Sequence, residues 1–352
     1  MVCGHTSSAL LSNAYRTGGW VEVWTFQRGL TSALFLLVAG FAFSVATARH
    51  WPWHVSLSVA TLKRLRRFGL LIVLGYALHF PVSHVAELAT ATGEQWRSFL
   101  AVDVLQMIGV TFVAVQALVM IARTRRAFTI STFVLVAAVV AAAPSVRGID
   151  WAPRLPLSIA AYLSPATGSQ FPLFPWAAYV LIGAGVGQLY ARWGAAHLTA
   201  FANRVMLTPG VVLIVGVSSV EGFLAGTPAG SWSAIPGDVL VRTGSCLIIL
   251  GILAHASRYI VQLPRVFGAV AQESLVVYFV HLCVVYGSIW NRGLYDFYAE
   301  ALTPAATVMT VLAVVAPMIA LAWAWNRLKH AQPRVAGFVS VAAGVGLVAL
   351  LL

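Results

Sequence analysis

Apolar runs of about 20 residues follow one another along almost the whole chain, and this repetition constrains the fold more than any single motif. Ten such runs predict ten membrane-spanning helices. They cover residues 29–48, 67–84, 100–122, 127–143, 172–191, 205–225, 237–257, 266–289, 304–326 and 335–352. No hydrophilic stretch between them is long enough to fold by itself. The sequence therefore predicts one all-α domain over residues 1–352, a polytopic helical bundle in a membrane.

The loops between these runs alternate in charge. One set contains basic residues and no Asp or Glu: Arg49, Lys63, Arg64, Arg66, Arg67, Arg123, Arg125, Arg126, Arg192, Arg204, Arg258, Arg265, Arg327, Lys329 and Arg334. The other set holds the acids Glu22, Glu87, Glu94, Asp150, Asp296 and Glu300 beside a few arginines. Basic loops are retained on the cytoplasmic side. We therefore expect an integral protein of a bacterial inner (plasma) membrane with the first set of loops inside.

Composition supports this class and excludes others. The 352 residues are 60% hydrophobic and 9% charged, which excludes a soluble globular protein. The net charge of +12 would suit nucleic acid, but basic cytoplasmic loops account for it, so we expect a lipid bilayer and no nucleic acid as partner. Cys3, Cys246 and Cys283 are isolated, which indicates neither a disulfide framework nor a metal site. The HWPWH segment at 50–54 is typical of the headgroup region.

The start of the chain is unusual for this topology. Residues 1–14 end on the outside and read as the outer half of an eleventh helix. We expect the inner half of that helix to be missing from this chain. A re-entrant N-terminal segment is the alternative.

Polar residues inside the apolar runs are the candidate functional groups, because a charge there costs roughly 2.5 to 3.5 kcal/mol on insertion scales. Asp103 and Gln106 are three residues apart and are expected on one helical face. Polarity at a helix end is the alternative for Asp103. Asp238 and Arg242 form an i,i+4 pair, which is either a structural salt bridge or part of a site.

The 266–289 run and the N-terminal segment contribute the histidines. Ser274, Tyr278 and His281 are spaced to share one helical face, and His5 lies near the outer end of its segment. Together with the preceding pairs, they predict a polar cavity that opens outward, with histidines for proton transfer near neutral pH.

Two further patterns concern the inner side and the packing. The basic residues at 63–67 and 123–126 either hold a phosphate-bearing cytoplasmic molecule or reflect ordinary positive-inside bias. Gly183 and Gly187 lie inside an apolar run with no strand before it, so they predict a small-xxx-small helix-packing face and not a nucleotide loop.

The order of several motifs resembles the transmembrane acyltransferases related to heparan-α-glucosaminide N-acetyltransferase and the acyltransferase-3 proteins. The motifs are GHTSSALL, FLLVAGFAFSVA, the basic KRLRR loop, VDVLQMIGV, FPLFPWAAYVLIGAGVG and ESLVVYFVHL. They cover most of the chain, and their order carries the resemblance because each one is degenerate. Two departures are that Met107 stands where a basic residue often follows the glutamine, and that no acidic-then-Arg-Gly segment precedes His5.

The resemblance implies an enzyme that transfers an acyl group, usually acetyl from cytoplasmic acetyl-CoA, to a sugar or glycan acceptor across the membrane. It implies that His5 is the catalytic histidine, either general base or transient acyl carrier. Asp103 is then a second catalytic residue or shapes the acceptor side with Gln106. His281, with Ser274, Tyr278, Asp238 and Arg242, would line the same cavity. For the donor it implies an acyl-CoA site, to which we assign Arg64, Arg66, Arg67 and Arg123, without a metal.

A transporter or flippase for a glycan or lipid-linked precursor is the alternative function. The same polar cavity would serve a substrate path without acyl-transfer chemistry. Dependence on acetyl-CoA separates the two hypotheses.

Overall fold

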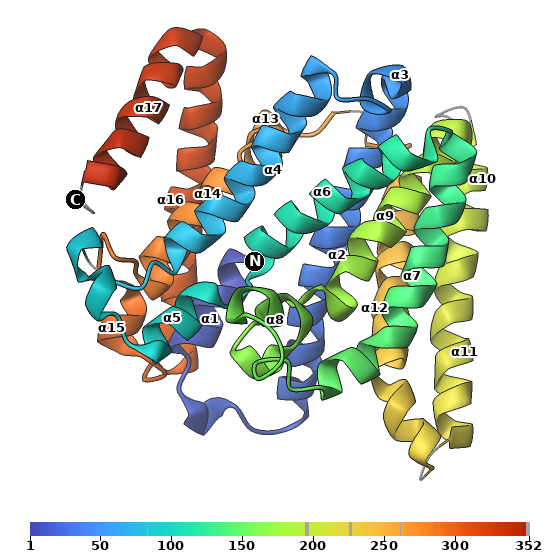
Figure 1. Cartoon of the computed structure of the whole chain (residues 1–352), viewed down its shortest axis with the longest axis horizontal. Coiled ribbons are helices and arrows are strands. Elements are labelled where there is room, and N and C mark those ends of the chain that lie inside the picture. Colours follow the sequence, from blue (N-terminus) through green and yellow to red (C-terminus); the bar gives the residue numbers. More distant parts are fainter. Residues whose placement is uncertain (83, 194–196, 225–226, 261, 350–352) are drawn as a thin grey trace. The chain divides into compact units, whose positions relative to one another are not determined.

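The computed structural model describes residues 1–82, 84–193, 197–224, 227–260 and 262–349; the side chains of 221, 224, 228–233 and 348 lie outside the description, as do the ends of the expected 205–225 and 335–352 spans. Every regular element in the described residues is a helix (Figure 1). The chain forms two compact units, Met1–Arg28 with Ala77–Phe99 and Val261–Leu352, and Gly29–Tyr76 with Leu100–Ile260. We call them the first and the second unit and describe each by itself.

The expected helical membrane bundle is confirmed. Among the described residues, seven helices are long and apolar enough to span a membrane: Gly19–Arg49, Val104–Ala122, Arg125–Gly148, Leu173–Trp193, Leu198–Val220, Ala234–Ala256 and Pro304–Ala331. A bent pair, Arg265–Gln272 with Ser274–Tyr286, raises the number to eight. The two other expected spans are helices as well. α4 (Val59–Leu78) carries four basic residues in its first half, and α17 (Pro333–Ala349) has only 17 residues.

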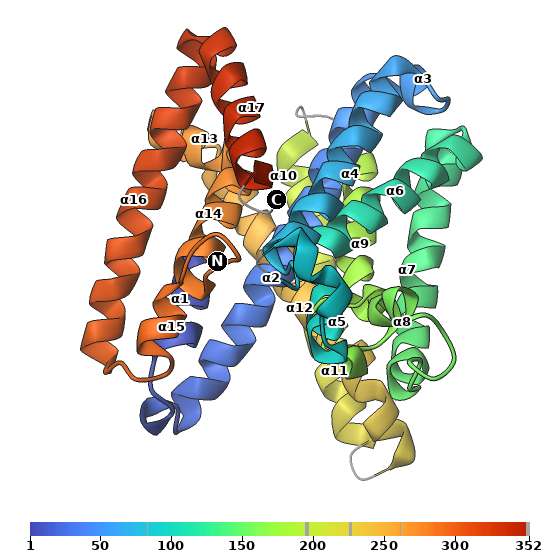
Figure 2. The same cartoon turned by 60° about the vertical axis from the view of Figure 1, so that its left-hand side comes forward.

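The first unit is built around three helices that share one core. α1 (Val2–Leu10) packs against α14 (Ser274–Tyr286), α15 (Leu294–Tyr298) and α16 (Pro304–Ala331). Ala9, Leu10, Val285, Val314 and Met318 are buried together there. α13 (Arg265–Gln272) precedes α14 at a bend of 72°, and α16 and α17 run antiparallel as a hairpin (Figure 2).

The second unit holds most of α2 (Gly19–Arg49) and α4 and a series of later helices: α3 (Trp51–His54), α6 (Val104–Ala122), α7 (Arg125–Gly148), α8 (Leu157–Leu163), α9 (Leu173–Trp193), α10 (Leu198–Phe201), α11 (Thr208–Leu224) and α12 (Pro228–Ala256). The short α5 (Gly93–Leu100) crosses the point in the sequence, between Phe99 and Leu100, where the first unit ends and the second continues. α7 lies along α9 and α11 along α12 (Figure 1).

Glycines allow α2 and α9 to touch backbone to backbone, as the small-xxx-small pattern predicts. A Cβ atom at Gly183 would collide with the carbonyl group of Leu37, and one at Gly40 would collide with that of Val180. One turn further along, a Cβ at Gly187 would lie 2.7 Å from the carbonyl oxygen of Phe41. Such close approach maximises packing between helices where lipid offers no hydrophobic driving force.

Candidate active site

Two histidines from opposite ends of the chain meet inside the first unit. The rings of His5 on α1 and His281 on α14 have centroids 5.3 Å apart, tilted by 53°. Two tyrosines of α14 complete the group. The ring of Tyr278 stands edge-on to both histidines, at 6.4 Å from His5 and 5.5 Å from His281. The Tyr286 hydroxyl lies 3.5 Å from Nδ1 of His5 and 3.4 Å from its carbonyl oxygen.

The two histidine rings differ in their surroundings. His5 is half-buried, whereas His281 is 1% exposed. Nδ1 of His281 lies 2.8 Å from the carbonyl oxygen of Val277, one turn earlier on the helix. A carbonyl oxygen only accepts, so Nδ1 carries the proton and Nε2 has a lone pair. In the part of the chain that the structure describes, this buried Nε2 has no hydrogen-bond partner.

Contacts at the C-terminal end of α1 hold His5 in place. Arg16 donates from Nη2 to the carbonyl oxygens of Ser8 and Leu11, each at 2.7 Å. Its Nη1 lies 3.6 Å from Oε1 of Glu300. The other carboxylate oxygen of Glu300, Oε2, accepts a bond from the side chain of Asn13. These contacts supply partners for the helix carbonyls that a C-terminus leaves unsatisfied. The backbone of Leu302 also pairs with Leu10 and Ser12.

The helix that carries His281 is not the continuous 266–289 helix that the apolar run predicts. It breaks at Glu273, which is 3% exposed and pairs with Lys329 and Asn326 of α16. Ser274 becomes the exposed first residue of α14, while Tyr278 and His281 are buried further along. All three residues therefore lie on α14, and Ser274 differs from Tyr278 and His281 in its exposure.

Asp103 and Gln106 do not share a helical face, so that expectation is wrong. Asp103 is extended, with φ −102° and ψ −179°, and is the N-cap of α6, accepting a bond from the amide of Val104 at 2.7 Å. The helix-end alternative is therefore correct for its position. Gln106 lies inside α6 with 0% exposure, and neither its amide nitrogen nor its oxygen has a partner in the described residues. It packs on Gly75 of α4, where a Cβ would collide with its carboxamide.

Asp238 and Arg242 form the i,i+4 ion pair that their spacing predicts. Nε of Arg242 donates to both carboxylate oxygens at 2.7 Å. The Arg242 side chain is 15% exposed, and its guanidinium fills the space over Gly29 of α2. The pair therefore also joins α12 to α2.

The four arginines assigned to the donor lie in different settings. Arg66, Arg67 and Arg123 are exposed, and Arg123 ends α6 with φ +56°. Arg64 instead turns into the second unit, where it donates to Oγ1 of Thr47 at 2.7 Å and lies over the ring of Phe43.

Two buried polar pairs of the second unit, Gln116 with His54 and Gln188 with Ser44, were missed by the sequence reasoning. Four of their atoms have no partner in the described residues: Ser44 Oγ, His54 Nδ1, Gln116 Oε1 and Gln188 Oε1. Gln116 donates to the carbonyl of His54, and Gln188 donates to that of Ser44. The available signal was the presence of Gln116 and Gln188 inside apolar runs, the same signal that pointed to Gln106.

HWPWH, the predicted interfacial segment, is partly internal. Trp51 and His54 are buried, whereas Trp53 is exposed and stacks on His50. Burial, together with the charges of Arg64 and His50, lowers the pKa of His54 to about 4. Within the described ranges no three His, Cys, Asp or Glu residues lie close enough together to hold a metal ion.

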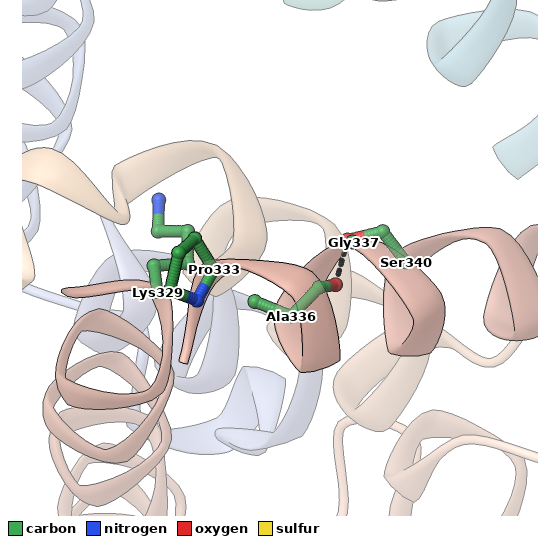
Figure 3. A pocket seen from close by; sticks show the side chains of 5 residues that line it. All are labelled: Lys329, Pro333, Ala336, Gly337 and Ser340. Atoms are coloured by element: carbon green, nitrogen blue, oxygen red, sulfur yellow. Dashed lines mark hydrogen bonds between the residues drawn. The ribbon is translucent and has the colours of Figure 1, made fainter. Parts of the chain in front are cut away.

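A cavity of about 270 Å³ lies at the turn between α16 and α17, lined by Lys329, Pro333, Ala336, Gly337 and Ser340 (Figure 3). The hydroxyl of Ser340 bonds to the carbonyl of Ala336 within its own helix. Lys329 is already paired with Glu273, so this cavity offers no unpaired charge from that lysine.

The helical bundle, in which a half-buried and a buried histidine meet, defines the class of polytopic helical membrane proteins. The model of the family described as heparan-alpha-glucosaminide N-acetyltransferase, catalytic, matches residues 1–228. The chain therefore belongs to this membrane N-acetyltransferase family, as the motif order predicts. His5, Asp103, Gln106 and the four arginines lie inside the matched residues, whereas Asp238, Arg242, Ser274, Tyr278 and His281 lie outside them. No curated protein and no solved structure matches the chain.

Proposed function

We propose that this protein transfers an acetyl group from cytoplasmic acetyl-CoA to a hydroxyl or amine of a sugar or glycan on the other side of the membrane. The observation that carries the proposal is the family match over residues 1–228, which includes His5. The meeting of His5 and His281 supports it, because general acid–base chemistry needs a group that exchanges protons near neutral pH.

The donor side of the proposal rests on the second unit. Arg64, Arg66 and Arg67 lie in the first half of α4 and Arg123 ends α6, and the positive-inside rule predicts that these basic residues face the cytoplasm of a bacterial cell. The unsatisfied polar atoms of Ser44, His54, Gln116 and Gln188 add buried polar groups in the same unit, and His54 lies close enough to Arg64 to be influenced by its charge. Exposed guanidinium groups suit the phosphates of coenzyme A, and the buried amides suit its amide-containing arm.

The acceptor side is assigned to His5 as general base or transient acyl carrier. Within the second unit, Asp103, Gln106 and the Asp238–Arg242 pair are the residues that we propose for acceptor recognition. Gln106 is the best placed of these for a hydroxyl-bearing ligand, since both ends of its carboxamide lack a partner in the described residues.

The test uses the purified protein in lipid nanodiscs with radiolabelled acetyl-CoA and a panel of amino sugars and glycans. The expected result is label transfer that falls at least 100-fold in His5→Ala, the range that general acid–base groups contribute. His330→Asn, a change at an exposed histidine, is the matched control. Full transfer in His5→Ala would refute the role of His5. Movement of a glycan without any need for acetyl-CoA would instead favour a transporter.

A further inference from the structure

We propose that His281, and not His5, is the base that takes the proton from the acceptor, a role that rests on the proposed acyl transfer and leaves His5 the role of transient acyl carrier. His281 lies outside the residues that the family model matches, so nothing in that match assigns it. The proposal is carried by the geometry of its two ring nitrogens.

The tautomer of His281 is fixed by its own helix. Its Nδ1 donates to the Val277 carbonyl at 2.8 Å, which holds the ring in one orientation and leaves Nε2 as the acceptor. A histidine whose only task is packing needs no second partner site. Here, however, Nε2 is buried without a partner in the described residues, and an unsatisfied buried acceptor is destabilising. A ligand that donates a hydrogen bond would satisfy this atom.

The neighbouring groups fit an acceptor that donates a proton. The ring of His5 lies 5.3 Å from the ring of His281. Two tyrosine rings of α14 lie beside them: Tyr278 contacts the ring of His281, and Tyr286 contacts the ring of His5. The Tyr286 hydroxyl lies 3.5 Å from Nδ1 of His5, so one hydroxyl group already stands beside the histidine pair. Elsewhere on α1, Thr6 Oγ1 and Ser8 Oγ are buried and lack partners in the described residues.

The charged and titratable groups around His281 are few. α1 presents His5 and the Met1 amino group, and α14 itself presents Tyr278, Tyr286 and Cys283. On α15 they are Tyr295 and Asp296, and Asp296 caps its own helix at the amide of Gly293. On α16 they are Arg327, Lys329 and His330, all in its last turns, where Lys329 pairs with Glu273. Among these side chains, His5 has its ring centroid 5.3 Å from that of His281.

The step balances as follows. A ring nitrogen of His5 forms a bond to the thioester carbonyl carbon, the carbon–sulfur bond breaks with its electron pair leaving on sulfur, and the thiolate takes a proton from water. The acceptor oxygen or nitrogen then forms a bond to the same carbon, its proton passes to Nε2 of His281, and the bond from the carbon to His5 breaks with its electron pair returning to the ring. His281 then returns its proton to water, so that acyl-CoA and acceptor give acylated acceptor and free coenzyme A.

The test compares His281→Asn and His281→Gln with His330→Asn. His330 makes the same bond from Nδ1 to a carbonyl four residues earlier, at 2.7 Å, but on an exposed face, so it is the matched control. Asn can keep the bond to Val277 and lacks a proton acceptor at the Nε2 position, whereas Gln preserves more of the volume. Folding of each variant is checked by its thermal midpoint in detergent.

We expect both His281 variants to lose about 100-fold or more in turnover with a sugar acceptor, with binding of acetyl-CoA unchanged. We also expect the wild-type rate to rise with pH, because that rise reports deprotonation of the base, and we expect both variants to lack it. Protein-dependent transfer to hydroxylamine, after subtraction of its direct reaction with acetyl-CoA in protein-free nanodiscs, stays within about threefold of wild type, because hydroxylamine attacks acyl groups without a base.

Three results would overturn the role of His281. The first is sugar-acceptor turnover within about threefold of wild type with an unchanged pH profile in either folded variant. The second is equal loss with sugar and hydroxylamine in a folded variant that still binds acetyl-CoA, and the third is loss of the same size in His330→Asn. Absence of transfer in the wild type with every acceptor and with hydroxylamine contradicts the proposed function itself, which separates the two failures.

Discussion

Nζ of Lys329 lies 2.6 Å from Oε1 of Glu273, a carboxylate that is buried at the break between α13 and α14. Asn326, one turn earlier on α16, donates to the same oxygen at 3.0 Å. The break in the helix that bears His281 is therefore tied to α16 by one ion pair and one amide.

Removal of Lys329 should destabilise the protein more than removal of both charges. Lys329→Met leaves the buried carboxylate of Glu273 without its cation. Because the lysine is partly exposed, we expect the loss to fall below the roughly 3–5 kcal/mol of a fully buried pair. Glu273→Gln in that background should recover part of the loss, because a neutral amide still accepts from Asn326. Thermal midpoints in detergent measure the order, and a double variant less stable than Lys329→Met would contradict it.

A methyl group in the contact between α2 and α9 should be costly. Gly183→Ala places a Cβ against the Leu37 carbonyl, and overpacking of this kind costs about 1–3 kcal/mol. Gly216→Ala in α11 is the matched control, because no atom lies within 4 Å of a Cβ there. The control should be neutral or gain up to about 1 kcal/mol from helix propensity. Equal thermal midpoints for the two variants would show that α2 and α9 can move apart without a loss of stability.

Acidification should destabilise the second unit through His54. Its folded pKa is about 4 against 6.5 for the unfolded chain. Between these values the unfolded chain binds the proton and the folded one does not, so stability falls as the pH drops from about 6.5 toward 4. His54→Gln should lower stability at pH 7.5 but flatten this dependence. Thermal midpoints between pH 7.5 and 5 test it, and the same slope in both proteins would exclude His54 as the source.

Gln106→Met should raise the stability of the protein and weaken its binding of the acceptor. Replacing an unsatisfied buried carboxamide by Gln106→Met removes a polar group worth about 1–3 kcal/mol of desolvation, so the thermal midpoint should rise. If the amide binds the acceptor, the KM for the acceptor should rise as well. The midpoint and the acceptor titration are measured on the same preparation. A variant that is both more stable and fully active would make Gln106 a packing residue only.

The fold class was predictable because it depends on patterns that lipid enforces. Long apolar runs must form helices, since backbone polar groups find no water in a bilayer. The contact of Gly183 with Leu37 also followed from spacing alone, because only small residues four apart permit it.

Local backbone geometry was less predictable. Asp103 was expected inside a helix because the apolar run begins before it, yet Asp favours the N-cap, and α6 begins only at Val104. The break at Glu273 has neither Gly nor Pro to mark it. Its one signal is the polar Gln272–Glu273–Ser274 triplet in the middle of an apolar run, and its partner Lys329 lies far away in sequence.

The meeting of His5 and His281 was only partly predictable. Periodicity placed His281 with Tyr278, and resemblance gave His5 its role, but neither specifies a distance between the two rings. The lone pair on Nε2 depends on the tautomer, and that depends on a bond to the Val277 carbonyl which sequence does not reveal.

The tie between Glu273 and α16 also bears on how the protein is assembled during synthesis. α13 and α14 leave the ribosome before α16, so their glutamate enters the bilayer without the lysine that neutralises it. An unpaired acid within an apolar segment opposes insertion of that segment into the bilayer. The half-helix that carries His281 is therefore expected to settle only after α16 has been made, which places completion of the histidine pair among the last events of biogenesis.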